Sequence, residues 1–318
     1  MGSPLRLQVA GSEEDPAVGA AWSAIVAEFE AAEEAMSRFR DTSEIHRLRR
    51  SGGRADTPSR RLVAALTAAD RARRVTEGRF DPRVLLDLER LGSTPLPIPI
   101  PADGEPASAV RPAPGGHRPD RALAVVCRSG RYGPIEVPIP VDFGGIGKGL
   151  ALRWAARRAR EALGERPFLL EAGGDIVGGG APGPDGWRIA VEDPRGPLDP
   201  SDSAELLVVL ELPLRGGSVA TSSVRRSRWK APDGRTVHHL IDPRTGEPGG
   251  DGLLAVTVTG SDPAWAEVWS KSLFLEGRRG IAALARARDL AAAWVTSDGA
   301  IEMTPRARLR TVWVAGEA

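Results

Sequence analysis

The sequence predicts an α+β protein with largely antiparallel sheets packed against helices. Short apolar segments of strand length follow one another directly in some places and across helices in others, so hairpin-like and helix-linked strands are mixed. This mixture differs from the regular alternation of a doubly wound fold, and no segment recurs at a fixed spacing. A length of 318 residues allows one large domain or two tightly joined ones, and a hydrophobic content of 41% is enough for a real core. We expect a single domain over residues 1–318.

Helical periodicity and turn residues predict the elements of the first third. A strand is expected at residues 5–10, followed by a helix at about 17–38, where Ala, Ile, Val and Phe recur at helical spacing. A second helix is expected at about 59–76, directly after a proline. The stretches at 36–48 and 77–82 are interpreted as turns, and the second turn leads into a short helix.

The remaining elements follow a shift in composition. Residues 93–120 are rich in Pro and Gly without any period, which predicts an exposed, extended or disordered insertion. Strands are expected at 122–128 and 135–140, and a glycine-rich turn with a helix at 141–164. Beyond this point strands and helices alternate, and the first of two late helices begins near Trp265.

Charge and composition argue against several classes of partner. Lys and Arg number 43 and Asp and Glu number 42, so the chain has no general attraction to nucleic acid or anionic lipid. No apolar run approaches the roughly 18 residues of a membrane helix, and the first residues contain no continuous apolar segment. The single Cys127, in an apolar run, rules out an internal disulfide framework. We therefore expect a cytoplasmic protein with no nucleic-acid partner and no stable membrane insertion.

Three stretches combine residues suited to binding a nucleotide. The segment VDFGGIGKG at 141–149 places four glycines before a helix start, where free N–H groups favour an anion, and Lys148 adds a positive charge. The segment LLEAGGDIVGGG at 169–180 is a second glycine-rich strand end and contains Asp175. The segment SVATSS at 218–223 groups hydroxyls that can bind phosphate oxygens. Each stretch is also compatible with a tight or capped turn.

Two adjacent histidines form a fourth candidate. His238 and His239 precede a Pro-Arg-Thr-Gly turn, and on a strand neighbouring side chains point to opposite faces. Only one histidine is therefore expected to face a site, as a general base or a phosphate contact. The spacing argues against a zinc-binding pair.

Taken together and in this order, these stretches resemble the ApbE family of FAD:protein FMN transferases. Further matching segments are MSRFRDTSEIHRL, EGRFDP, HHLIDPRTGEP and WAEVWSKSLFLEG, so the likeness extends from about residue 36 to 277. The resemblance implies an ApbE/T-fold-like structure and the transfer of FMN from FAD to a Thr or Ser hydroxyl of an acceptor flavoprotein, with release of AMP. It also implies a divalent cation, usually magnesium. Two alternatives are a flavin-binding protein with lost or altered metal-dependent transfer, and a hydrolase of the FAD diphosphate.

The resemblance also implies roles for individual residues. His239 corresponds to the residue expected to act as a base or phosphate contact. Gly145 and Glu267 correspond to positions that bind the metal ion. The expected contacts with the flavin cofactor are Met36, Arg79, Phe80, Asp81, Asp142, Lys148, Thr221, Ser222, Ile241 and Lys271.

One position departs from the family pattern. The late helix of the family carries Asp and Thr four residues apart as cation ligands, and the aligned residues here are Glu267 and Lys271. Glutamate can bind a hard cation through oxygen, whereas protonated lysine has no acceptor. A surface Glu267–Lys271 ion pair worth roughly 0.2–0.5 kcal/mol is one interpretation. The second interpretation rests on the rarity of lysine, which occurs three times among 43 basic residues. In this interpretation the Lys271 ammonium occupies or borders the magnesium position. Mg²⁺ binding is therefore in question.

Overall fold

The computed structural model describes residues 4–9, 15–93, 125–126, 133–196, 205–225 and 227–316. The chain divides into two compact units. Unit 1 contains Glu30–Gly147 and Trp229–Pro248, and unit 2 contains Gly2–Phe29, Lys148–Arg228 and Gly249–Ala318. Apart from Ser93, the insertion expected at 93–120 lies outside the described residues, as does Cys127.

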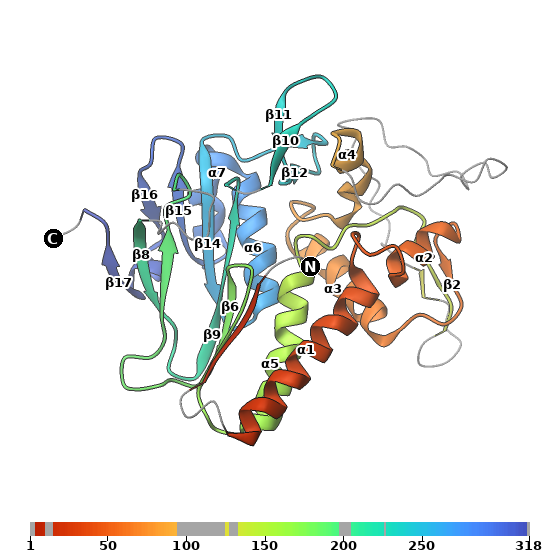
Figure 1. Ribbon diagram of the computed structural model, residues 1–318. Helices are drawn as coiled ribbons and strands as arrows, with labels where there is room; N and C mark the ends of the chain where they lie inside the picture. Colours follow the sequence, from red (N-terminus) through yellow and green to blue (C-terminus); the bar gives the residue numbers. More distant parts are fainter. Residues whose placement is uncertain are drawn as a thin grey trace. The chain divides into compact units, whose positions relative to one another are not determined.

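A seven-stranded sheet forms the main sheet of unit 2 (Figure 1). All of its neighbouring strands are antiparallel, which confirms the sheet type that the sequence predicts. In spatial order the strands are β1 (Leu5–Val9), β5 (Phe168–Ala172), β6 (Asp175–Gly179), β9 (Gly216–Ser223), β14 (Leu253–Gly260), β15 (Ala291–Thr296) and β16 (Ile301–Met303).

Successive side chains of a strand point to opposite faces of the sheet. Different elements pack on the two faces of the main sheet. On one face, α5 (Gly147–Leu163) and the first part of α1 (Pro16–Met36) form a core with β5 and β6 that includes Leu170 and Val177. Helix α6 (Pro263–Leu275) packs on β9 and β14, and α7 (Gly277–Ala287) follows it. The neighbouring residues Leu169 and Ile176 belong to a separate core on the opposite face.

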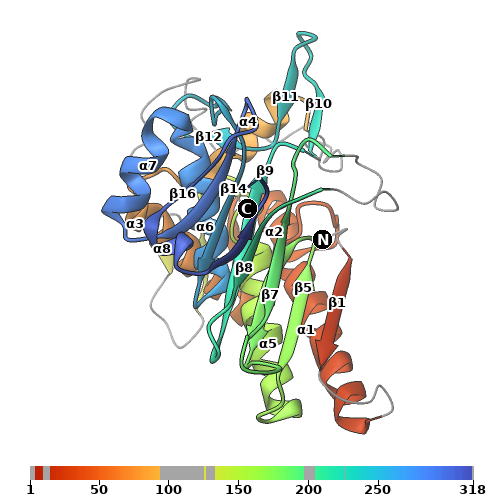
Figure 2. The ribbon, with the colours of Figure 1, turned by 90° about the vertical axis from the view of Figure 1, so that its left-hand side faces the viewer.

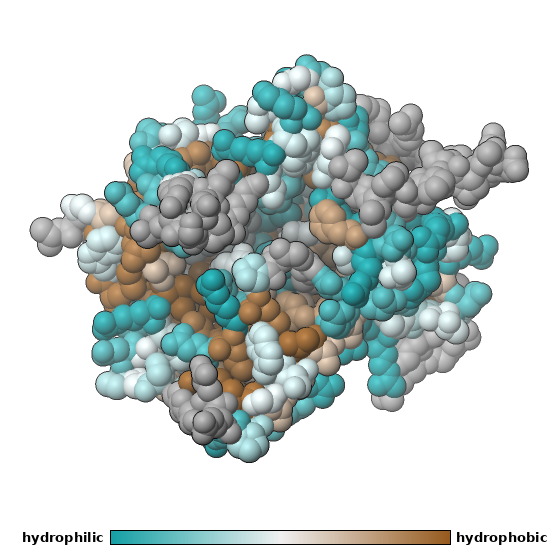
Figure 3. Space-filling view, in the orientation of Figure 1, coloured by the Kyte–Doolittle hydropathy of each residue, from teal (hydrophilic) through white to brown (hydrophobic). Residues whose placement is uncertain are grey.

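A three-stranded sheet covers that opposite face (Figure 2). Its order is β17 (Thr311–Val314), β8 (Leu206–Glu211) and β7 (Arg188–Glu192), and α8 (Pro305–Arg308) precedes β17. Leu206, Val312 and Trp313 of this sheet are exposed, and Figure 3 shows apolar side chains gathered in this part of the surface. The shift in register between Thr311 and Trp313 gives β17 an irregular edge.

Unit 1 combines helices with short strands. Its helices are the rest of α1, α2 (Glu44–Arg50), α3 (Arg60–Val75), α4 (Leu85–Arg90) and the 3-10 turn η1 (Pro82–Val84). Its strand pairs are short: β2 (Arg54–Ala55) and β3 (Val125–Val126) flank β4 (Ile135–Glu136), β10 (Arg228–Lys230) pairs with β11 (Thr236–His238), and β12 (Ile241–Asp242) pairs with β13 (Glu247–Pro248). Leu88, Leu91, Ala231, Val237 and Ile241 form one of its cores.

Most predicted elements agree with the structure, but the strand expected at 135–140 is limited to β4 (Ile135–Glu136). The strand at 5–10 and the helices at 17–38 and 59–76 are β1, α1 and α3, with ends displaced by one or two residues. The stretch at 36–48 is not a turn throughout, because α2 begins after Ser43, whose Oγ accepts a hydrogen bond from the His46 N–H. No helix in the described part of the chain has both the length and the apolar character needed to cross a membrane.

Candidate functional site

In unit 2, three charged side chains from distant parts of the sequence meet on the helix-covered face of the main sheet. Lys148 is the second residue of α5, Asp175 is the first residue of β6, and Glu267 lies in α6. The Lys148 ammonium forms an ion pair with the Asp175 carboxylate, and its Nζ lies 3.4 Å from Glu267 Oε1. Both carboxylates are buried, whereas 30% of the Lys148 side chain is exposed.

Backbone N–H groups complete this carboxylate–lysine cluster. Gly149 N–H donates to Glu267 Oε2 at 2.8 Å, and Thr221 N–H donates to Asp175 Oδ1 at 3.1 Å. The first N–H groups of a helix have no partner within it, so Glu267 acts as a cap for α5 from another helix. A Cβ on residue 149 would lie 2.5 Å from both Pro263 O and Ala264 Cα, so the close approach of α5 to α6 requires glycine.

The cluster keeps Lys148 charged. Burial by itself lowers the pKa of Lys148, but the carboxylates of Asp175 and Glu267 outweigh it and raise the pKa above its ordinary value. Burial raises the pKa of Glu267, and the positive charges of Lys148 and Lys271 act in the opposite direction without cancelling it. Lys271, one helical turn after Glu267, is thus close enough to act electrostatically on this carboxylate.

The adjacent residues Thr221 and Ser222 of β9 point to opposite faces. Ser222 Oγ lies 2.9 Å from Ser270 Oγ on α6, and the Ser270 hydroxyl donates to the Glu267 carbonyl at 2.9 Å. Thr221 Oγ1 lies 2.9 Å from Oγ1 of Thr257, its partner on β14. The Ser222 hydroxyl is therefore on the side of the carboxylate–lysine cluster, whereas Thr221 contributes its backbone N–H there.

In unit 1, the predicted residues near the glycine-rich turn are mostly buried. Met36 ends α1, and Gly145 is buried in the turn at 144–146. The buried Asp142 carboxylate lies 3.4 Å from the Nε of Arg38, and its backbone N–H donates to the Pro82 carbonyl at 2.7 Å. The flavin and metal contacts expected of Met36, Asp142 and Gly145 stay predictions.

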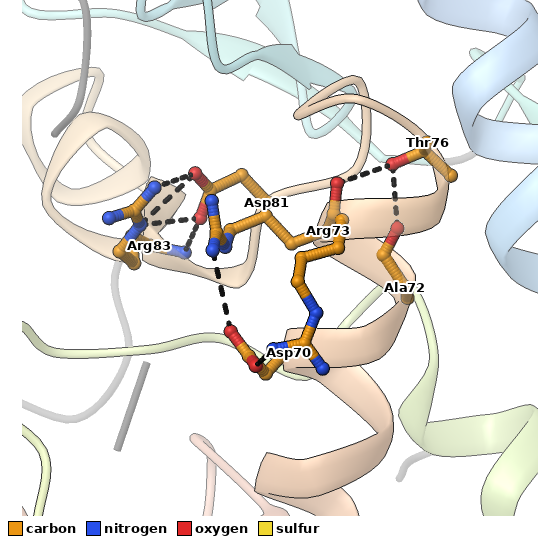
Figure 4. Close-up of polar contacts among 7 residues, drawn as sticks. Asp70, Ala72, Arg73, Thr76, Asp81 and Arg83 are labelled. Carbon is orange, nitrogen blue, oxygen red and sulfur yellow. Dashed lines mark hydrogen bonds and ion pairs between the residues drawn. The ribbon is translucent and has the colours of Figure 1, made fainter. Parts of the chain in front are cut away.

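The turn at 77–82 is held together locally (Figure 4). Asp81 accepts hydrogen bonds from the backbone N–H of Arg83 at 2.9 Å and from its guanidinium at 2.6–3.1 Å, and both side chains are buried. Phe80 is buried, and its N–H donates to Thr76 Oγ1 at 3.0 Å. Arg79 donates to the Glu77 carboxylate at 2.9 Å. Of the three predicted residues, Arg79 and Asp81 therefore each already have a charged partner.

The same Asp-Pro-Arg turn occurs three times in the sequence. Asp193 and Asp242 each accept from the backbone N–H and the guanidinium of the arginine two residues later, as Asp81 does. Proline fixes the backbone between the pair, and an aspartate side chain readily accepts from the N–H two residues on. The Asp-Pro-Arg motif is therefore a local signal in the sequence for an aspartate–arginine pair.

His239 lies between two strands rather than on one. Strand β11 ends at His238, so the alternation of side chains along a strand does not extend to His239, and both histidines are partly exposed. His238 Nδ1 accepts from the Leu240 N–H at 3.3 Å, and Ile241 is buried in the core with Leu88. The Ile241 N–H donates to the His239 carbonyl at 3.1 Å. The roles expected of His239 and Ile241 stay predictions.

The residues around Glu267 do not fit a divalent metal ion. Mg²⁺ prefers oxygen ligands at about 2.0–2.1 Å, but both Glu267 oxygens already face a nitrogen donor, as do those of Asp175. An ion bound to Glu267 Oε1 would lie within about 5.5 Å of the Lys148 ammonium, since that oxygen is 3.4 Å from Nζ. At an effective dielectric constant of about 20, the repulsion is about 6 kcal/mol. Across the described residues, no three His, Cys, Asp or Glu side chains are grouped to hold a metal ion.

Asp175 was visible in the sequence without an evident role, and no sequence pattern pointed to Ser270 or Thr257. Asp175 is the partner of Lys148, and Ser270 links Ser222 to α6. The separation of 27 residues between Lys148 and Asp175 gives no local signal of their contact.

Comparisons with known proteins identify the family that the sequence of this chain matches. The ApbE family model matches residues 1–294. A FAD:protein FMN transferase of Klebsiella pneumoniae (strain 342) is 27% identical over 306 residues, which cover 94% of this chain and 83% of the relative. One of Salmonella typhimurium (strain LT2) is 28% identical over 273 residues, which cover 83% of this chain and 73% of the relative.

Solved structures share the fold. The ApbE protein of Thermotoga maritima superposes with a TM-score of 0.78 at 24% identity and covers 97% of this chain and 96% of its own. The apo form of the Pseudomonas stutzeri flavinyl transferase ApbE gives a TM-score of 0.73 at 25% identity, covering 98% and 94% of the two chains. These likenesses confirm the α+β fold class that the sequence predicts.

Proposed function

Because the chain belongs to the ApbE family, we propose that it is a FAD:protein FMN transferase. The observation that carries the proposal is the family match over residues 1–294, which includes every stretch on which the resemblance rests. The acceptor is proposed to be a flavoprotein with a Thr or Ser target.

The proposed reaction exchanges one phosphorus–oxygen bond for another. The acceptor hydroxyl oxygen attacks the phosphorus of the FMN half of FAD, and a base takes the hydroxyl proton. The bond from that phosphorus to the bridging oxygen breaks, and AMP leaves with the electron pair. The products are a phosphoester-linked flavoprotein and AMP, so no oxidant or reductant is needed.

We assign the base to His239, whose ordinary pKa range suits proton transfer near neutral pH. Lys148 is proposed to face the phosphates at the start of α5, where its charge and the helix N-terminus both favour an anion. Its partly exposed side chain and its raised pKa support this assignment. Met36, Arg79, Phe80, Asp81, Asp142, Thr221, Ser222 and Ile241 are proposed as the other flavin contacts.

The test uses the purified protein, FAD and an acceptor domain with a Thr or Ser target. Transfer adds the mass of an FMN phosphoester to the acceptor and releases AMP in equal amount. His239→Asn is expected to lower the rate by about 10²-fold or more, whereas the adjacent His238→Asn provides a matched control with little effect. Equal rates for both variants would contradict the role of His239.

One observation favours a second candidate, a flavin-binding protein without transfer activity. Both Glu267 oxygens, at a position expected to bind the metal ion, are engaged by Lys148 and Gly149. Such a protein would be purified with bound flavin and release no AMP from added FAD. AMP and free FMN formed at equal rates with and without acceptor would instead indicate a hydrolase.

A further inference from the structure

The carboxylate–lysine cluster is balanced in charge without any added ion. Asp175 and Glu267 contribute two carboxylates, the Lys148 ammonium lies at both of them, and Lys271 lies one helical turn after Glu267 in α6. Each carboxylate also accepts one backbone N–H, from Thr221 and from Gly149. A divalent cation added here would give a largely buried site an excess of two positive charges.

The type of basic residue supports a specific role for these cations. Lysine occurs only three times in the whole sequence, and two of the three act on Glu267. An ammonium is a compact point charge that fits between two carboxylates, whereas a guanidinium is planar and larger. The third, Lys230, is exposed and contacts the Thr236 hydroxyl at 2.9 Å, so it provides an internal control.

We propose that Lys148 and Lys271 are the built-in cations of the Asp175–Glu267 pair, so that this cluster takes no divalent metal ion. Lys148 bridges the two carboxylates, and Lys271 lies one helical turn after Glu267 in α6, where protonated lysine offers no ligand. In consequence, the FMN transfer by this protein proceeds without Mg²⁺, a part of the inference that rests on the proposed function.

The first experiment measures metal binding directly, without FAD, whose phosphates bind metals themselves. Mn²⁺ is titrated into the purified protein and the free ion is followed by electron paramagnetic resonance. Wild type and Lys230→Thr are expected to leave the Mn²⁺ signal as in buffer. Lys271→Thr, with folding checked by circular dichroism, is expected to bind Mn²⁺ at least tenfold more tightly than wild type. Stoichiometric binding by wild type that Glu267→Gln abolishes would overturn the proposal, and unchanged binding in Lys271→Thr would contradict the role of Lys271.

The second experiment separates this inference from the proposed function. AMP release from FAD is measured with acceptor present, in EDTA and in Mg²⁺. Rates within twofold of each other support both proposals. Release that occurs only with Mg²⁺ supports the transferase and overturns the metal-free cluster. If no condition releases AMP, the transferase proposal fails, and the Mn²⁺ titration still decides whether the cluster excludes metal ions.

Discussion

The Asp-Pro-Arg turns and the carboxylate–lysine cluster neutralise buried carboxylates in two different ways. In the turns, the arginine that pairs with the aspartate lies two residues away in the sequence. In the cluster, Lys148 reaches Asp175 across 27 residues and Glu267 across 119. A local pair forms wherever its short motif occurs, whereas a distant pair exists only when the helices and the sheet that carry it are packed together.

The three turns also differ among themselves. The exposed fractions of the Asp and Arg side chains are 3% and 4% for Asp81–Arg83, but 9% and 51% for Asp193–Arg195. The local geometry is the same, so the pairs differ mainly in burial, although the charge of Arg225 also acts on Asp193.

Arg83→Met is expected to have the largest effect. Removing the guanidinium leaves the buried Asp81 carboxylate without its paired cation, which lowers the free energy of unfolding by about 3–5 kcal/mol. Arg195→Met, the same change in the more exposed turn, is expected to cost at most about 1 kcal/mol. Urea denaturation of both variants measures the difference, and equal losses would show that burial does not set the importance of these pairs.

Lys148→Met tests the distant cluster in the same way. The change leaves two buried carboxylates with Lys271 as their remaining basic neighbour in the cluster, and we expect a loss of about 3 kcal/mol in the free energy of unfolding. Lys230→Met at an exposed position should stay within about 0.5 kcal/mol of wild type. A loss below about 1 kcal/mol for Lys148→Met would mean that water, not the ammonium, stabilises the carboxylates.

Gly149→Ala probes the helix approach that brings the cluster together. The new Cβ would meet backbone atoms of Pro263 and Ala264 at 2.5 Å, and we expect a loss of about 1–3 kcal/mol in the free energy of unfolding. Gly19→Ala is the control, because it lies in α1 with no atom within 4 Å of the added Cβ. That variant is expected to be more stable than wild type by about 0.5–1 kcal/mol. Thermal unfolding of both variants distinguishes a general alanine effect from a clash at residue 149.

Replacing the surface carboxylate of Asp298 should have the smallest effect on stability, and only at acid pH. The Thr296 hydroxyl, the Arg278 guanidinium and the Ala300 N–H lower the pKa of Asp298 from 3.8 to about 2. The ionised carboxylate therefore stabilises the fold above about pH 4, and this contribution is lost as the pH falls towards 2. Asp298→Asn should flatten this part of the curve of melting temperature against pH. An unchanged acid limb would show that Asp298 titrates alike in the folded and unfolded chain.

Much of the fold and part of the site could be predicted from the sequence. Helix α3 was predicted because a proline directly before a helix is a local signal, and the structure adds the Ser59 cap, whose Oγ accepts from the Leu62 N–H at 3.1 Å. Helix α2 was missed because Ser43 gives the same signal inside a short polar stretch. The family match and the α+β class were also correct. The single domain over 1–318 and the individual flavin contacts stay predictions.

The sequence by itself determined the features that depend on neighbours in the chain: the Asp-Pro-Arg turns, the helix caps and the alternation of the strands. It also singled out Lys271 as unusual beside Glu267. Only the tertiary structure decided that Lys148 bridges Glu267 to Asp175, because this contact needs α5, α6 and β6 to pack at Gly149. Electrostatic attraction acts through space, so the partner of a buried carboxylate is set by packing and not by distance along the chain.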